Sequence, residues 1–194
     1  MEKQTLQNKK VAVLVANGFE ESEFTEPVKA LKNAGAEVTV VSLKSGKVKA
    51  WAEKNWGGEY DVDATVDKVS SESFDALVLP GGVMNPDLLR ASKDAVEFVK
   101  GFSEEAKPIA AICHGPWTLI EAGIAQGRKM TSYHSIKTDL INAGADWTDQ
   151  EVVTDNGLVT SRSPEDLPAF CAKMIEEIAE GQHLTRNRGV HQLG

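Results

Sequence analysis

Short apolar runs, each no longer than one β-strand, constrain the fold of this chain more than any other feature. Four of them recur between longer segments with helical periodicity, at residues 11–16, 37–43, 75–80 and 108–113. Strands that are buried on both faces of a parallel sheet have runs of this kind. When such strands alternate with helices, the helices cover both faces of the sheet. The pattern therefore predicts an α/β protein, a three-layer α/β/α sandwich with a mainly parallel sheet.

The segments between these runs predict helices, a further strand and a hairpin. Residues 23–35 place apolar side chains on one helical face, and residues 85–106 predict a helix that is broken near residues 91–93. Residues 130–133 predict a short fifth strand. Residues 151–162 predict two strands about an Asn-Gly turn, which is a strong hairpin signal.

The length of the chain predicts a single domain over residues 1–194. No internal repeat or linker divides it, and the predicted core covers about residues 10–181. Residues 182–194 have no hydrophobic periodicity, so we expect a mobile tail or a docking arm there.

The composition narrows the partners and the compartment that we expect. The formal net charge of −8 disfavours nucleic acid as the main partner, and no apolar run is long enough to span a membrane. The first residues lack the apolar core of a signal peptide, and the chain has two cysteines, Cys113 and Cys171. We therefore expect a cytoplasmic protein without a disulfide framework.

A cysteine and a histidine mark the end of the fourth apolar run. Cys113 and His114 stand where the strand gives way to a helix, and Gly115 relieves crowding there, as in a nucleophile elbow. Unpaired backbone N–H groups at the start of a helix favour a thiolate over a thiol. The alternative is that Cys113 is a small buried hydrophobe. His114 is the candidate base, but neighbours at a turn generally point apart, so contact with the sulfur is not assumed.

Glycines and carboxylates follow two other strands of the predicted sheet. Gly81 and Gly82 end the third run, where their backbone N–H groups can approach an oxyanion closely. Glu20, Glu21 and Glu23 follow the first run. One of them, protonated, could donate a hydrogen bond to the Cys113 sulfur with a raised pKa; equally, all three could simply complement a helix dipole.

No cofactor and no metal are expected from the sequence. The four histidines, His114, His134, His183 and His191, form no set with the spacing of metal ligands. The first strand is not followed by G-x-G-x-x-G, and no G-x-x-x-x-G-K-[ST] occurs, so nicotinamide and P-loop nucleotides are disfavoured.

Several of these segments together resemble the PfpI intracellular protease-like family, in the superfamily of the parkinsonism-associated deglycase. The similarity runs in order from about residue 11 to residue 178, and the A-x-C-H-G-P block is its most specific motif. The segments are "ANGFEESEF", "FDALVLPGG", "KPIAAICHGPWTLIEAG", "GRKMTSYHSIKTDLINAGADW" and "VVTDNGLVTSRSPEDLPAF". The resemblance implies a flavodoxin-like sheet of the class I glutamine amidotransferase type.

The resemblance also implies roles for particular residues and an oligomer. Cys113 matches the nucleophile, His114 stands beside it, and Glu23 matches the carboxyl near the sulfur. The remaining matches are Glu20 and Tyr133 in the pocket, Gly81, Gly82 and the His114 backbone as the oxyanion site, and Asp87 at the position of a triad glutamate that is reached across a subunit contact. The family implies a homodimer, in some cases a hexamer, and a role in stress response.

Three functions share this one site. The first is an enzyme for small reactive carbonyls, of the glutathione-independent glyoxalase or deglycase type, in which Cys113 forms a hemithioacetal. The second is a cysteine peptidase or amidase that uses Cys113, His114 and Asp87. The third is a redox sensor or holdase chaperone, since an accessible thiolate is easily oxidised. We expect carbonyl chemistry first, on small carbonyls or glycated protein.

Overall fold

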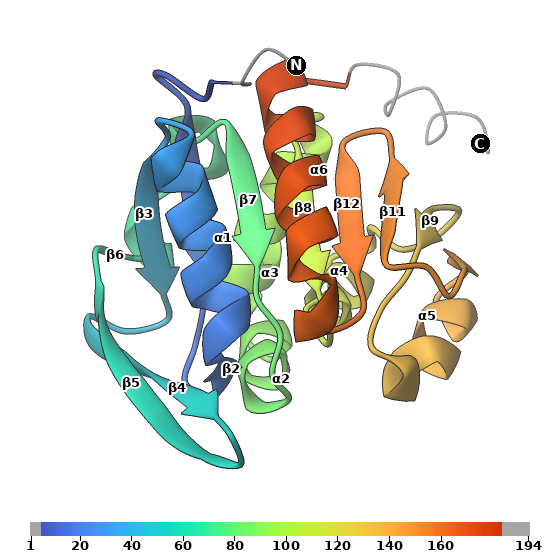
Figure 1. Cartoon of the computed structure of the whole chain (residues 1–194), viewed down its shortest axis with the longest axis horizontal. Coiled ribbons are helices and arrows are strands. Elements are labelled where there is room, and N and C mark those ends of the chain that lie inside the picture. Colours follow the sequence, from blue (N-terminus) through green and yellow to red (C-terminus); the bar gives the residue numbers. More distant parts are fainter. Residues whose placement is uncertain (1–4, 184–194) are drawn as a thin grey trace.

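The computed structural model describes residues 5–183, so residues 184–194 of the predicted tail lie outside the described residues. The chain forms a three-layer α/β/α sandwich, which confirms the predicted fold class (Figure 1). The helices are α1 (Glu21–Asn33), α2 (Met84–Arg90), α3 (Lys93–Glu104), α4 (Pro116–Glu121), α5 (Lys137–Asn142) and α6 (Leu167–Glu180).

The central sheet has seven strands in the order β11-β12-β8-β7-β1-β3-β6. They are β1 (Lys10–Leu14), β3 (Glu37–Ser42), β6 (Ala64–Thr65), β7 (Ala76–Leu79), β8 (Ile109–Ile112), β11 (Val152–Asp155) and β12 (Leu158–Ser161). All neighbouring strands pair in parallel except β11, which pairs antiparallel with β12. The predicted Asn-Gly hairpin therefore places one antiparallel strand at an edge of the sheet.

Two hydrophobic clusters pack on opposite faces of this sheet. On one face α1 and α6 contribute Phe24, Leu31, Phe170 and Met174, and on the other α3 and α4 contribute a second set of buried side chains (Figure 1). Three of the four apolar runs supply the middle of the sandwich, since β1 after its first residue, β7 and β8 are buried throughout. Burial on both faces explains why these strands lack polar alternation.

A small antiparallel hairpin lies beside the main sheet. β4 (Gly46–Ala52) and β5 (Asn55–Val62) pair with each other, and β4 also pairs with β2 (Phe19–Glu20). The predicted fifth strand at residues 130–133 is displaced, because β9 (Lys129–Met130) pairs only with β10 (Asp146–Trp147). The further parallel strands of the main sheet are β6 and β12 instead.

The predicted break in the helical segment 85–106 is present. α2 ends at Arg90 and α3 begins at Lys93. Between them Ser92 adopts extended backbone and its side chain accepts a hydrogen bond from the Ala95 N–H, so a new helix starts there.

In the part of the chain that the structure describes, no helix is long and apolar enough to cross a bilayer.

The stability of this fold depends on the buried central strands. Leu14 on β1 is completely buried, so Leu14→Ala removes a packed side chain and leaves a cavity. We expect the free energy of unfolding to fall by about 2–5 kcal/mol, measured by urea denaturation. The matched control is Ile141→Ala on α5, where the side chain is exposed and the change is expected to stay within about 0.5 kcal/mol. Equal losses in the two variants would contradict this account of the core.

Candidate active site

Cys113 lies at a sharp turn between β8 and α4. Its φ is +62°, a left-handed conformation that non-glycine residues rarely adopt. Gly115 makes the turn possible, because a Cβ there would lie 2.6 Å from the Leu79 carbonyl oxygen and 2.9 Å from that of Ile112. The predicted elbow at Cys113 thus has the strained backbone that such turns require.

Hydrogen bonds on both sides hold the strained residue in place. The Cys113 N–H donates to the Ser161 carbonyl at 3.0 Å, and the Cys113 carbonyl accepts from the Tyr133 N–H at 2.9 Å. One bond extends the pairing of β8 with β12, and the other ties the loop after β9 to the elbow. The backbone of Tyr133 therefore helps to position Cys113, a role beyond the predicted one of lining a pocket.

A completely buried carboxyl stands next to the Cys113 sulfur. Glu23, in the first turn of α1, interacts with the thiol, and its Oε2 accepts a hydrogen bond from the Gly81 N–H at 2.9 Å. Its other oxygen, Oε1, is buried without a hydrogen-bond partner. Of the three acids after the first strand, Glu23 is the one that reaches the sulfur, as the family resemblance implied.

The backbone amides are shared between the carboxyl and the sulfur. The N–H groups of Gly82 and His114 point at the Cys113 sulfur, whereas Gly81 uses its N–H on Glu23. That Gly81 donates to an oxyanion therefore stays a prediction, since its N–H is engaged with Glu23 in this arrangement. Gly81 is required for a different reason, since a Cβ there would lie 2.5 Å from Glu23 Oε2 and 2.6 Å from Cys113 Cβ.

The protonation of the carboxyl agrees with one of the two alternatives from the sequence, whereas that of the thiol does not agree with the expected thiolate. Burial raises the pKa of Glu23 to about 8, so it is a carboxylic acid at neutral pH. Burial, and then the negative charge of Glu23 when it ionises, raise the pKa of the Cys113 thiol. These directions do not support the expected resting thiolate, which stays a prediction. The start of the helix after Cys113, which was expected to favour the thiolate, also has only a weak dipole, because α4 is only six residues long.

His114 contacts the sulfur directly. Its Nδ1 lies 3.1 Å from Cys113 Sγ, although adjacent residues at a turn generally diverge. Burial, followed by the nearby charge of His134, lowers the pKa of His114 to about 4, so its ring is neutral and can accept a proton. The left-handed backbone at Cys113 is what allows the two neighbouring side chains to converge.

Three side chains that sequence reasoning missed or undervalued orient the His114 ring. Its Nε2 lies 3.0 Å from Ser135 Oγ, which takes the place of a triad carboxylate. Tyr133 stacks on the ring at 4.9 Å between centroids, and Trp117 meets its edge at 5.2 Å. Ser135 could have been found from the sequence, because it stands two residues after Tyr133, at the end of the strand predicted over residues 130–133.

Asp87 does not join this group within the described chain. It lies on α2, and its Oδ1 accepts hydrogen bonds from Arg90 Nη2 at 2.7 Å and Nε at 3.0 Å. The Arg90 guanidinium in turn lies 4.3 Å over the Trp117 ring. Asp87 therefore reaches the surroundings of His114 only through Arg90 and Trp117, and its part in a triad stays a prediction about a subunit contact.

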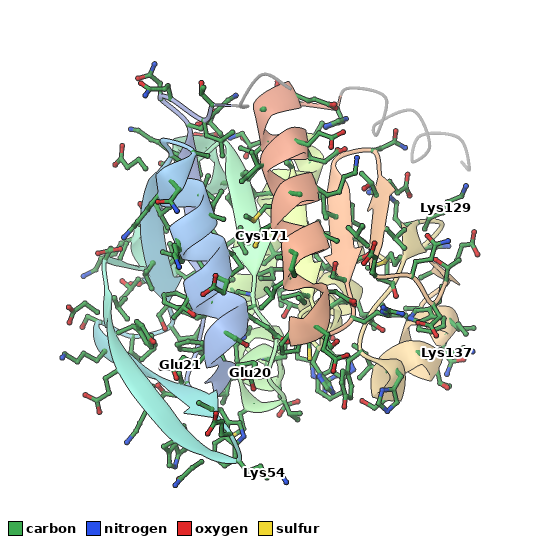
Figure 2. All side chains as sticks on the ribbon, in the orientation of Figure 1. Glu20, Glu21, Lys54, Lys129, Lys137 and Cys171 are labelled. Carbon is green, nitrogen blue, oxygen red and sulfur yellow. The ribbon has the colours of Figure 1, made fainter. Side chains whose placement is uncertain are left out.

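The other two acids after the first strand have separate surroundings. Figure 2 shows Glu20 and Glu21 at the end of α1 that faces the β4–β5 hairpin, whereas Cys171 lies midway along α6. Burial raises the pKa of Glu20, which also interacts electrostatically with Glu23. Glu21 instead accepts hydrogen bonds from the Gly58 N–H and the Tyr60 hydroxyl, so it anchors the hairpin.

A pocket opens beside the ring stack. It has a volume of about 630 Å³ and is lined by Tyr133, His134, Trp147 and Arg162, among others. Arg162 is held by Asp166 and Asp149. The size suits a small carbonyl compound or a modified side chain. Cys113, Glu23 and His114 do not line this pocket, and its link to the elbow is Tyr133, which stacks on the His114 ring.

No cofactor is needed to explain the contacts around Cys113. Within residues 5–183, the metal-binding residue types gather closely enough for one ion at a single place, and it is formed by Glu177, Glu180 and His183 rather than by the elbow. The expectation of no bound group at the active site stays a prediction.

The buried sheet and the strained cysteine define an α/β protein with a sharp turn at Cys113 after a central strand. Comparison with known proteins agrees: the model of the DJ-1/PfpI family matches residues 9–177, so the chain belongs to this family. A solved structure with the same fold is DJ-1beta of Drosophila melanogaster, with a TM-score of 0.80 and 34% identity over 88% of this chain and 90% of that one.

Three similar relatives carry names that describe a stress protein, a protease and a deglycase. The chain is 52% identical over 164 residues to general stress protein 18 of Bacillus subtilis, covering 84% of this chain and 93% of the relative. It is 47% identical over 163 residues to putative cysteine protease YraA of Bacillus subtilis and 47% identical over 165 residues to protein/nucleic acid deglycase 2 of Escherichia coli. Each of these two alignments covers 84% of this chain and 94% of the relative.

The buried acid should leave a signature in the pH dependence of stability. Glu23 titrates at about 8 in the folded protein, against 4.5 for an ordinary glutamate. Between these values the folded state keeps a proton that the unfolded state has lost, so the free energy of unfolding falls as the pH rises. We expect Cys113→Ser to lose more stability from about pH 5 to about pH 8 than Cys113→Ser/Glu23→Gln, measured by urea denaturation. Parallel curves for the two variants would contradict the assignment.

Proposed function

We propose that this protein is a cysteine-dependent enzyme for reactive carbonyls, with glutathione-independent glyoxalase and deglycase activity in stress response. The observation that carries the proposal is the contact of one thiol with both a neutral imidazole and a protonated carboxyl. The names of the similar stress protein and deglycase support it.

The first chemical step uses the two proton carriers together. The Cys113 sulfur attacks the aldehyde carbon of methylglyoxal as the thiol proton passes to His114 Nδ1, 3.1 Å away. Glu23 carries its proton next to the sulfur, with Oε1 free of other hydrogen bonds, and gives it to the carbonyl oxygen. The product is a neutral hemithioacetal. No resting thiolate is required, which agrees with the raised pKa of the thiol.

The remaining steps are an internal redox change and a hydrolysis. A proton moves from the former aldehyde carbon to the neighbouring carbonyl carbon. The hydroxyl proton of the hemithioacetal moves to the oxygen of that carbonyl, and the two transfers together give a thioester of lactate. Water then cleaves the thioester, which releases lactate and restores the thiol. Methylglyoxal and one water give one lactate, so no external oxidant or reductant is consumed. The same pocket would accept early glycation adducts on amino groups, which are also aldehyde adducts.

A peptidase or amidase is the second candidate, and the name of the similar putative cysteine protease favours it. The geometry within one chain favours a peptidase less than it favours carbonyl chemistry. The His114 ring is held by the Ser135 hydroxyl, and the Asp87 carboxylate is paired with Arg90. A peptidase would need a partner subunit to bring a carboxylate to His114. The third candidate, a redox sensor, would use the same thiol, which is neutral and 7% exposed at rest.

The proposed assembly is a homodimer in the cytoplasm. α2 and the residue before it expose three apolar side chains, Val83, Met84 and Leu88, beside Asp87 and Arg90. A contiguous apolar patch of this kind is typical of an interface. A dimer through α2 would bring a second chain close to Trp117 and the His114 ring.

Lactate formation tests the proposed activity. With methylglyoxal and without glutathione, the wild-type protein should form lactate, and Cys113→Ser should lower kcat/KM by at least about a thousandfold because it removes the nucleophile. Cys171→Ser is the control, since Cys171 lies on α6 away from the elbow. If Cys113→Ser kept wild-type activity, the proposed function would be lost.

The oligomeric state can be tested separately. Leu88→Glu places a charge in the exposed apolar patch of α2, so we expect the dimer to become a monomer in size-exclusion chromatography with light scattering. Ile141→Glu, at an exposed apolar residue on α5, is the matched control and should leave the mass unchanged. A wild-type protein that is monomeric at all concentrations would refute the proposed assembly.

A further inference from the structure

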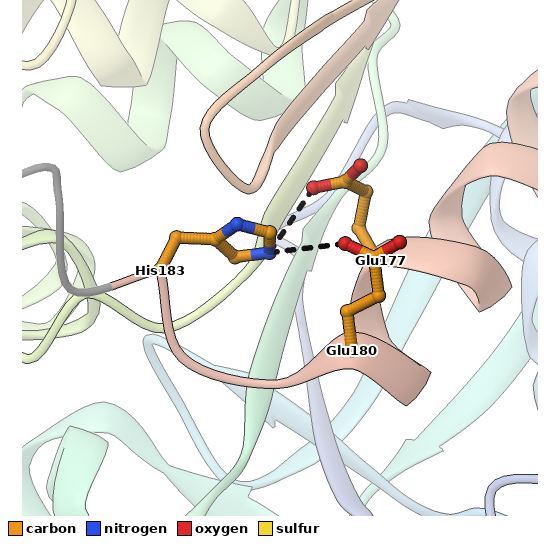
Figure 3. A group of neighbouring side chains, drawn as sticks. All are labelled: Glu177, Glu180 and His183. Carbon is orange, nitrogen blue, oxygen red and sulfur yellow. Dashed lines mark ion pairs between the residues drawn. The ribbon is translucent and has the colours of Figure 1, made fainter.

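Two carboxylates and an imidazole converge at the C-terminal end of α6. Glu177 and Glu180 lie on the last turn of that helix, and His183 follows the glycine that ends it (Figure 3). Gly181 has a φ of +85°, which turns the chain back so that the imidazole faces the two carboxylates. The sequence prediction counted histidines alone and therefore missed this group.

The three side chains are close enough to share one ion. His183 Nε2 lies 3.2 Å from Glu177 Oε2 and 4.0 Å from Glu180 Oε2, and all three ligand atoms lie within 4.8 Å of one another. Tetrahedral zinc with bonds near 2.0–2.1 Å holds its ligand atoms about 3.3–3.4 Å apart. The 3.2 Å between His183 Nε2 and Glu177 Oε2 already fits this geometry. The Glu180 side chain is exposed, so it can move to shorten its 4.0 Å separation from the same nitrogen.

The inner side of this group is buried and lacks hydrogen-bond partners. Glu177 is more than nine-tenths buried, and neither its Oε2 nor His183 Nε2 has a hydrogen-bond partner. These two atoms face each other and form an ion pair only when the imidazole is protonated. A neutral imidazole protonated at Nε2 would donate a hydrogen bond to this oxygen, whereas one protonated at Nδ1 would set a nitrogen lone pair against the carboxylate, an arrangement that is costly unless a cation lies between them.

The backbone around the group is already fixed to the rest of the fold. The His183 N–H donates to the Ala106 carbonyl at 2.9 Å, and Gln182 Nε2 donates to the Glu105 carbonyl at 3.2 Å. Glu177 also interacts with the Gly157 N–H in the turn between β11 and β12. Three segments that are distant in sequence therefore meet at this point, and little ordering would remain for a bound ion to impose.

This place is distinct from the active site. Ala106 and Gly157 precede β8 and β12, so the group lies at the amino ends of the parallel strands. Cys113 follows β8 at their carboxyl ends. A cation bound there would not touch the reacting atoms, and its effect would be on stability.

We propose that Glu177, Glu180 and His183 form a structural site for a divalent transition-metal cation of the zinc class. One imidazole nitrogen and two carboxylate oxygens are ligands that such ions accept, and a water molecule would complete a tetrahedron. The bound ion would fasten the end of α6 and residues 181–183 to the amino edge of the sheet. The competing explanation is a His183–Glu177 ion pair that needs no metal.

Zinc titration of the full 194-residue chain tests the proposal. The background is Cys113→Ser/Cys171→Ser, because thiolates bind zinc and would obscure a second site. In isothermal titration calorimetry we expect one Zn²⁺ per chain, and a higher melting temperature when zinc is present. Adding His183→Asn or Glu180→Gln should weaken the affinity by at least about tenfold. Glu180 is exposed, so the second variant should fold even if the first does not.

The matched control is Glu176→Gln, which removes a carboxylate from the same turn of α6. Glu176 pairs with Lys173 and does not belong to the group, so zinc affinity should stay within about twofold. Failure of the background protein to bind stoichiometric zinc would overturn the proposal. It would also fail if all three variants bound zinc equally, because the metal would then lie elsewhere.

Discussion

The contact between a buried carboxyl and a buried thiol is the constraint on which the rest of the structure depends. Glu23 comes from α1 on one face of the sheet, and Cys113 comes from the turn after β8. Gly81 stands between them, where any side chain would collide with both. The strand ends must therefore be aligned to a fraction of an ångström, and the buried strands β1, β7 and β8 provide that rigidity. In return, the burial keeps Glu23 protonated and able to act as an acid.

Most of the layout followed from local patterns. The apolar runs marked β1, β3, β7 and β8, the Asn-Gly pair marked the hairpin at the sheet edge, and the glycine after Cys113-His114 marked the elbow. These features depend on residues close together in the sequence, where period and turn chemistry carry strong signals. The family resemblance added Glu23, because the three neighbouring acids could not be separated by pattern alone.

The chemistry of the site depends on distant residues and was harder to foresee. The convergence of His114 on the sulfur follows from the left-handed backbone at Cys113, and the Ser135 contact comes from a loop 21 residues away. The sign of the thiol pKa shift depends on burial, which outweighs backbone amides at a short helix. The displaced strand at β9 reflects pairing with β10, a choice that propensity does not encode.

The edges of the central sheet limit the ways in which copies of this chain can associate. One edge strand, β6, has two residues, and the other, β11, has four and runs against its neighbour. Such short borders offer few free peptide groups to a second sheet, so continuous β-extension into fibrils is disfavoured.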